Sequence, residues 1–175
     1  MKKAIIGGII TLVIGGTGYT ISQSDVVSNF AKNTGMSQQQ AQQYVNNSQN
    51  NLASFSKVGQ DFVSDGNSLL NTSIDCQNYT YEWVTSSLSC EEGKSDLQTI
   101  GNDEVQLGYC YQALGTDLGS ASRSKISECI NDIDAVDTSY DLPLAVSVIG
   151  SSKITDLKNN NLYNKSVLQS ALNSN

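Results

Sequence analysis

The sequence predicts a mostly α-helical fold, a small helical bundle that contains a helical hairpin, is stapled by disulfides and follows an apolar N-terminal segment. Apolar residues recur at three- and four-residue intervals through much of the chain, which is the period of an amphipathic helix. The four cysteines are an even number in a chain with an export-like N-terminus, a combination typical of structural disulfides. With 38% hydrophobic and 15% charged residues and a single proline, the chain has the composition of a folded domain rather than a disordered one.

Composition and charge exclude several functional classes. Of the 175 residues, 66 are Ser, Thr, Asn or Gln, and the net charge is −7. Nucleic-acid binding needs clustered cations, and this chain has only one arginine, Arg123. The absence of histidine removes imidazole-based catalysis and histidine metal sites. We therefore expect no nucleic-acid partner, no enzymatic activity and no cofactor.

Residues 1–21 have the features of an export signal or a membrane anchor. Lys2 and Lys3 are followed by no charge until Asp25. The strongly apolar part, residues 4–14, would extend only about 16 Å as a helix, roughly half the thickness of a bilayer's hydrocarbon core. This length favours a cleaved signal peptide, and the small residues before Tyr19 favour cleavage after Gly18.

The anchor is the close alternative. Residues 15–21 would extend the span to about 18 residues. Gly7, Thr11 and Gly15 are spaced as in membrane helices that pack closely. Membrane contact through residues 4–21 therefore stays open. In both cases the lysines stay inside, so residues 22–175 form an extracytoplasmic domain, whether periplasmic, extracellular or anchored.

Two helical segments are expected in the first half of this domain. Residues 24–32 form a short helix with Val26, Val27 and Phe30 facing inward, ending near Gly35. Residues 37–70 then form one long helix, or two in line, with Ser37 as the N-cap. The apolar stripe of this segment contains small residues at seam positions, namely Ser48, Gly59 and Gly66. They suit close packing against another helix, either within the fold or from a partner subunit.

The second half predicts a helical hairpin and a helical C-terminus. Residues 74–84 fit a strand or a helix equally, since Tyr79, Tyr81 and Trp83 alternate. Residues 102–114 and 122–136 each have one apolar face and form the hairpin. Pro143 breaks the chain, and the apolar run 142–149 that follows is not assigned by its period, although Pro143 suits the first turn of a buried helix. Two weakly amphipathic helices then flank a turn at residues 159–161.

The hairpin suggests how the cysteines pair. Cys110 and Cys129 lie on the facing stripes of its two helices, within reach of a disulfide after a modest stagger. Cys76 then pairs with Cys90. The sequence alone leaves the two crossed pairings open. No Cys-x-x-Cys pair is present, which disfavours a redox or four-thiolate metal site.

Clusters of carboxylates provide weak candidates for chemistry. Four aspartates near the end of the second hairpin helix are candidate metal ligands: Asp132, Asp134, Asp137 and Asp141. Their spacing is not that of an EF-hand loop, so a solvated helix end is the favoured interpretation. Glycoside hydrolysis needs two converging carboxylates. The adjacent pairs 91–92 and 103–104 do not supply them, because neighbouring side chains point to different faces.

Two functions are consistent with these observations. The favoured one is a non-catalytic structural or accessory subunit of an envelope or membrane-associated assembly, acting on protein partners through its helices. The alternative is a soluble periplasmic or secreted binding module for a small ligand or calcium.

Overall fold

The computed structural model describes residues 21–49, 55–72, 90–114, 118 and 121–174. Within these ranges the chain forms seven helices and no strand, which confirms the mostly α-helical fold. The helices are α1 (Gln23–Thr34), α2 (Gln38–Gln49), α3 (Phe55–Leu70), α4 (Cys90–Leu114), α5 (Arg123–Ser139), α6 (Pro143–Ile149) and α7 (Ser151–Asn173).

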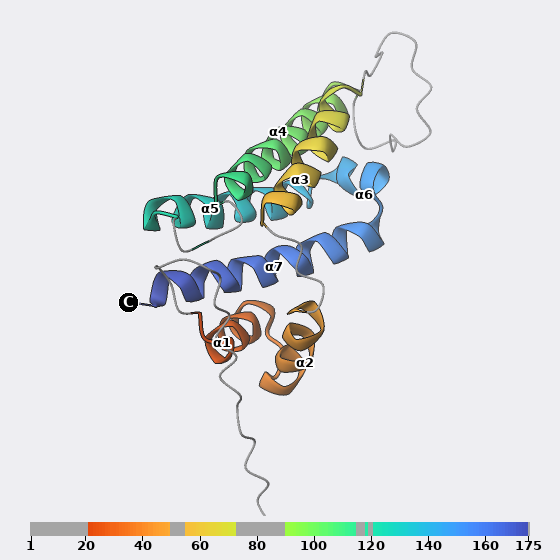
Figure 1. Cartoon of the computed structure of the whole chain (residues 1–175). Helices are drawn as coiled ribbons and strands as arrows, with labels where there is room; N and C mark the ends of the chain where they lie inside the picture. The colour runs from red at the N-terminus through yellow and green to blue at the C-terminus, as the bar shows by residue number, and fades with distance from the viewer. Residues whose placement is uncertain (1–20, 50–54, 73–89, 115–117, 119–120, 175) are drawn as a thin grey trace, which may run out of the picture.

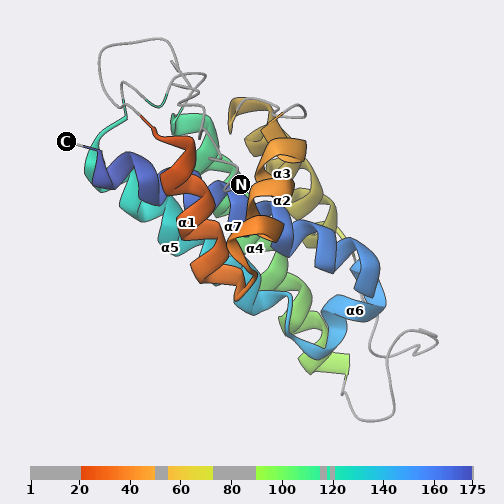
Figure 2. The ribbon, with the colours of Figure 1, turned by 90° about the horizontal axis from the view of Figure 1, so that it is seen from below.

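Helix α7 lies between two groups of helices (Figure 1). Helices α1 and α2 lie on one side of it, and α3, α4 and α5 lie on the other. The view from below shows α1 and α2 in front of α7 (Figure 2). Helix α7 contacts α1, α5 and α6, so it connects the two groups.

The C-terminal end of α1 and the N-terminal end of α2 lie where the sequence predicts. Val26, Val27 and Phe30 are buried on α1, which ends at Gly35 with a left-handed φ of 69°. Side-chain bonds at the start of α2 satisfy free backbone N–H groups. Gln40 N donates to Ser37 Oγ at 3.4 Å, and Ser37 N donates to Gln40 Oε1 at 3.1 Å. This is a capping box, which confirms Ser37 as the N-cap.

The two helices within residues 37–70, α2 and α3, pack against different partners. Helix α2 packs on α1, where the rings of Phe30 and Tyr44 stack 4.6 Å apart. Helix α3 packs instead along α4, and the two helices lie in different parts of the molecule (Figure 1). The periodicity predicted the helices, but it could not show that their apolar faces have different partners. Residues 50–54 lie outside the described ranges.

Glycines bring α3 and α4 into close contact. A Cβ atom added to Gly59 would lie 2.5 Å from the carbonyl oxygen of Gly108, and one on Gly66 would lie 2.6 Å from that of Gly101. In each helix the two glycines are seven residues apart, so they share one face. We call these four residues the glycine seam. The small residues Gly59 and Gly66 thus pack within the chain, while Ser48 lies in α2.

Helices α4 and α5 form the predicted hairpin. The Ser122 hydroxyl caps α5 by accepting a hydrogen bond from Lys125 N at 3.1 Å. Cys110 and Cys129 form a disulfide with a Cα–Cα distance of 5.5 Å, as predicted. Helix α4 begins at Cys90, a dozen residues earlier than the apolar pattern indicated. Cys90 is also disulfide-bonded. Its predicted partner, Cys76, lies outside the described residues, so that pair stays a prediction.

The C-terminal region differs from the prediction in one respect. Pro143 does occupy the first turn of α6. The expected turn at residues 159–161 is wrong, because α7 runs through it without a break. Asn161 is buried and donates to Asp137 Oδ1 at 2.8 Å, and Asn160 Oδ1 accepts the Tyr44 hydroxyl at 3.4 Å. These amides bond to neighbouring helices instead of their own backbone, so they do not end the helix.

The predictions for the N-terminal segment and for residues 74–84 stay predictions. Residues 1–20, and residues 73–89 with Tyr79, Tyr81 and Trp83, lie outside the described ranges. Among the helices that are described, none combines the length and apolar character needed to cross a membrane.

Candidate functional site

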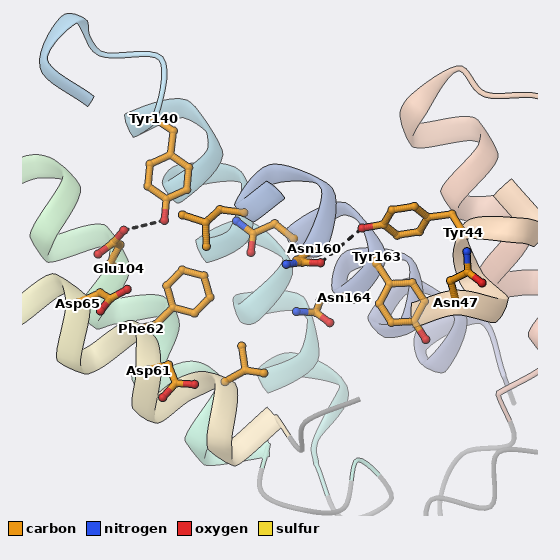
Figure 3. A pocket seen from close by; sticks show the side chains of 13 residues that line it. Tyr44, Asn47, Asp61, Phe62, Asp65, Glu104, Tyr140, Asn160, Tyr163 and Asn164 are labelled. Atoms are coloured by element: carbon orange, nitrogen blue, oxygen red, sulfur yellow. Dashed lines mark hydrogen bonds between the residues drawn. The ribbon is translucent and has the colours of Figure 1, made fainter. Parts of the chain in front are cut away.

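A pocket of about 580 Å³ opens between the two groups of helices. Its walls come from α2, α3, α4 and α7 and from Tyr140, the C-cap of α5. Figure 3 shows Glu104, Asp65, Phe62 and Tyr140 toward one end and Tyr44, Asn47 and Tyr163 toward the other. The full lining is Tyr44, Asn47, Val58, Asp61, Phe62, Asp65, Glu104, Tyr140, Leu157, Asn160, Asn161, Tyr163 and Asn164.

Glu104 is a buried carboxyl group in this lining. Its side chain is only 3% exposed, and its Oε1 accepts a hydrogen bond from the Tyr140 hydroxyl at 2.6 Å. Its second oxygen, Oε2, is buried with no hydrogen-bond partner. Burial raises the pKa of Glu104 to about 7, because a desolvated carboxylate is costly. The Tyr140 bond and the charge of Lys153 oppose this rise in the pKa, whereas the charge of Asp65 adds to it.

The rest of the lining is acidic, amide-rich and aromatic. Three side chains are carboxyl groups and four are asparagines, and no lysine or arginine is among the described lining residues. Asp61 and Asp65 lie on α3 and pair with Lys57 and Lys153, respectively. Asn161 Oδ1 is a second buried acceptor that has no hydrogen-bond partner. Two of the lining residues therefore carry a covered acceptor that lacks a donor, Glu104 Oε2 and Asn161 Oδ1.

The four aspartates predicted as weak metal candidates do not form one cluster. Three of them lie on α5 or just after its C-terminal end and point toward α7, and each interacts with a different residue of α7. Asp134 pairs with Lys165, Asp137 accepts from Asn161, and Asp141 pairs with Lys158 at 2.6 Å. We call these three pairs the polar row. Because each aspartate is directed to a different residue of α7, they do not converge on one ion.

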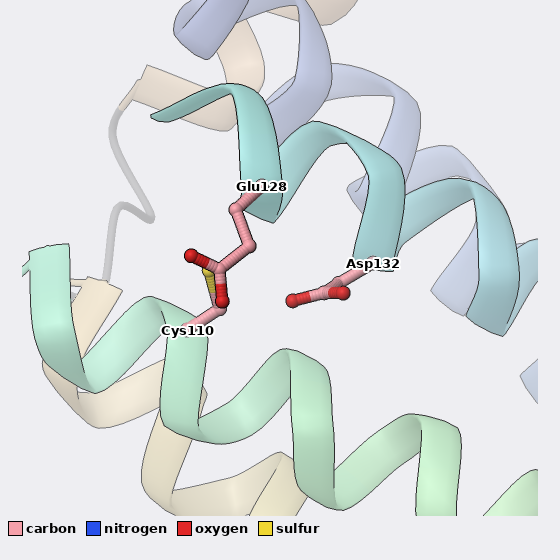
Figure 4. Close-up of side chains that lie close together, drawn as sticks. All are labelled: Cys110, Glu128 and Asp132. Atoms are coloured by element: carbon pink, nitrogen blue, oxygen red, sulfur yellow. The ribbon is translucent and has the colours of Figure 1, made fainter. Parts of the chain in front are cut away.

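Asp132, the fourth aspartate, lies on the side of α5 that faces α4. Figure 4 shows it beside Glu128 and Cys110, whose potential ligand atoms all lie within 4.8 Å of one another. The Cys110 sulfur is bonded to Cys129, so it is not the thiolate that a metal would bind. Two carboxylates then remain, which is too few ligands for a protein metal site.

Glu104 was considered in the sequence only as one of the adjacent pair 103–104, and its place in a pocket was not predicted. Its neighbour Asp103 lies elsewhere, half-buried beside Ser139, and burial raises its pKa too. A signal for Glu104 is present in the pattern. It follows Ile100 by four residues and precedes Leu107 by three, and both are fully buried, so it lies within the apolar stripe of α4. A carboxyl group at such a position is either paired or functional.

No protein-family model, no curated protein and no solved structure matches this chain. What the pocket binds is therefore inferred from its own chemistry.

Proposed function

We propose that this chain is a non-catalytic binding module that holds a small ligand in the pocket between its two groups of helices. The observation that carries the proposal is the pocket lining, where polar groups surround a buried carboxyl that lacks a basic partner among the described lining residues. Ligand sites are typically concave and combine apolar walls with a few convergent polar groups. As part of the proposal, the module is exported and works outside the cytoplasm, on the basis of residues 1–21.

The close packing of α3 favours this function over the subunit role ranked first from the sequence. That role depended on a helix with small residues that was available to a partner. Gly59 and Gly66 contact α4, so this face of α3 is already occupied. The pocket, in contrast, is open to a molecule from outside.

The lining indicates how a ligand would be held. Phe62, Val58 and Leu157 supply apolar surface that excludes water from the ligand's hydrocarbon part. The asparagines supply amide groups, each of which has donors and an acceptor. An anionic ligand is disfavoured because three carboxyl groups and no cation line the pocket.

The non-catalytic part of the proposal is supported by the inventory of reactive groups. The chain has no histidine, and the acids Asp61 and Asp65 are each paired with a lysine on the protein surface. Glu104 is bonded to Tyr140. None of these groups is arranged as a nucleophile with its own general base.

Fragment screening by NMR on the ¹⁵N-labelled full-length chain tests the proposal. We expect compounds that shift the backbone amide signals of Phe62, Glu104 and Asn164. Asn47 is an exposed residue of the lining, so Asn47→Trp should obstruct the pocket and abolish these shifts. Asn131→Trp, at an exposed position of α5 outside the lining, is the matched control and should retain them. Shifts that persist in Asn47→Trp, or a screen without binders, would contradict the proposal.

An accessory subunit is the second candidate. It is favoured by α6, where Val146 is 54% exposed and Val148 is 36% exposed. The size of the native particle separates the two functions. A larger particle in detergent-solubilised membranes supports the subunit, and a free monomer supports the binding module.

A further inference from the structure

We propose that the ligand carries a protonated amine, which lies at the end of the pocket formed by Glu104, Asp65 and Phe62. This inference depends on the proposed function, because it assumes that the pocket binds a small molecule. It goes beyond that function by assigning the ligand's charge and its orientation in the pocket.

Missing hydrogen-bond donors are the first support. Glu104 Oε2 and Asn161 Oδ1 belong to side chains that are 3% and 1% exposed, and neither oxygen has a partner. Buried acceptors without donors are costly and uncommon in native proteins. An ammonium group has three donors and no acceptor. Both oxygens are covered by neighbouring atoms. Once the covering side chains move aside, an ammonium group therefore satisfies them better than a hydroxyl group, which has one donor.

The charge at this end of the pocket is the second support. Asp65 lies close enough to Glu104 for its charge to raise the pKa of Glu104. The chain's own cation, Lys153, lies 3.4 Å from Asp65, but both side chains of that pair are more than half exposed. Water screens such a pair, so it does not neutralise the buried carboxyl. A cation inside the pocket would act at lower dielectric, where attraction extends over several ångströms without direct contact.

The aromatic lining is the third support. Phe62 is 8% exposed and lines the pocket at the same end as Tyr140 and Glu104 (Figure 3). The face of an aromatic ring attracts a cation within about 6 Å of its centre. At the other end, Asn47, Tyr44 and Tyr163 provide hydrogen-bonding groups for a polar tail. The pocket thus distinguishes the two ends of a ligand.

Amine binding should also displace a proton. Glu104 has a pKa of about 7, so near neutral pH a large fraction of it is protonated. An ammonium ion stabilises the carboxylate, and the Glu104 proton then leaves for the buffer. A neutral or anionic ligand gives no such release.

The test uses three probes with one phenol ring and different charges: tyramine, its alcohol analogue 4-(2-hydroxyethyl)phenol, and 4-hydroxyphenylacetate. They are measured beside a fragment library that contains equal numbers of amines, neutral compounds and carboxylates. For the full-length chain at pH 7, we expect tyramine to bind at least about tenfold more tightly than the alcohol, and the carboxylate to bind most weakly. Calorimetry in two buffers of different ionisation enthalpy should show proton release for tyramine alone.

Variants at two carboxylates identify the source of the preference. Glu104→Gln keeps the acceptor for Tyr140 but removes the charge, so the preference for amines should fall severalfold and the proton release should vanish. Glu128→Gln removes one exposed carboxylate outside the pocket and should leave both unchanged.

The possible failures are distinguishable. Equal or tighter binding of neutral probes, or an amine preference that is undiminished in Glu104→Gln, overturns the inference and leaves the binding pocket in place. If no compound of any class binds, the proposed function falls, and the inference falls with it.

Discussion

The glycine seam and the polar row are two helix interfaces built on opposite principles. In the seam, α3 and α4 approach so closely that an added methyl group would meet the partner's backbone at 2.5 to 2.9 Å. In the polar row, α5 and α7 are held by side chains at their margin, including Asp134 with Lys165 and Asp141 with Lys158. The difference indicates where the fold tolerates change. Atoms cannot be added to the seam, whereas exposed charges of the polar row are replaceable.

The largest effect on stability is expected from substituting Glu104. This ionisable residue borders the glycine seam, because a Cβ on Gly66 would lie 3.0 Å from Glu104 Cβ. Its pKa is higher in the folded chain, about 7, than the ordinary value of 4.5. Its contribution to stability is thus present below pH 4.5 and lost as the pH rises to 7. Glu104→Gln should remove this loss and be more stable than wild type by about 3 kcal/mol above pH 7.

Urea unfolding of both proteins at several pH values measures this difference. Other acids with raised pKa values, such as Asp137, contribute to both proteins and cancel. Glu128→Gln, a substitution outside the pocket, should lack this gain of stability above pH 7. A Glu104→Gln protein that is less stable than wild type at pH 8 would show that the carboxylate stabilises the fold.

Gly108→Ala is the next largest change. The new Cβ would lie 2.6 Å from Val63 Cγ2 and 2.7 Å from Gly59 O, and overpacking of this kind costs about 1–3 kcal/mol. Alanine favours a helix over glycine by about 1 kcal/mol, so a net destabilisation shows that the close contact outweighs propensity. At Gly35, by contrast, a Cβ has nothing within 4 Å, and Gly35→Ala tests backbone strain alone. A Gly108→Ala protein of raised melting temperature would disprove the close contact.

In the polar row, the buried member should matter more than the exposed ones. Asp137→Ala leaves the Asn161 amide without its acceptor in a residue that is 1% exposed, which costs about 1–2 kcal/mol. Asp134→Ala removes an exposed pair with Lys165 and should cost less than about 1 kcal/mol. Thermal unfolding of the two variants compares them directly. Equal losses would mean that burial does not distinguish these pairs.

Calcium should have the smallest effect. Asp134, Asp137 and Asp141 are directed to separate residues of α7, and Asp132 faces α4, so millimolar calcium should leave the melting temperature unchanged. Binding at one hundred times the dissociation constant would instead add about 2.7 kcal/mol. A rise of several degrees that disappears in the Asp134→Asn, Asp137→Asn double variant would reveal a site in the polar row.

Local signals predicted local features of this fold. Ser37 caps α2 where its hydroxyl group suggested, and the facing stripes of the hairpin placed Cys110 against Cys129. The failures involve contacts between distant segments. Nothing near Asn161 in the sequence shows that its side-chain amide donates a hydrogen bond to Asp137. The run of asparagines at 159–161 therefore predicts a turn, where the structure has a continuous helix.

The candidate site was less predictable than the fold. Its residues come from four helices and the C-cap of α5, and periodicity assigns faces to helices without showing which faces meet. The weak amphipathic pattern of α7 also results from contacts with several other helices. A helix with neighbours on two sides buries residues around much of its circumference, and α7 buries Ile154, Tyr163 and Leu168 together with Ser166 and Ser170.

The central position of α7 also determines the order in which the molecule can be completed during synthesis. It is the last of the described helices to leave the ribosome, yet it joins the first, α1, to α5. Until it emerges, α3, α4 and α5 can pair among themselves, but α1 and α2 have no surface on which to close the pocket. Contacts between such distant segments form slowly. The nascent chain therefore stays incompletely folded until α7 has emerged.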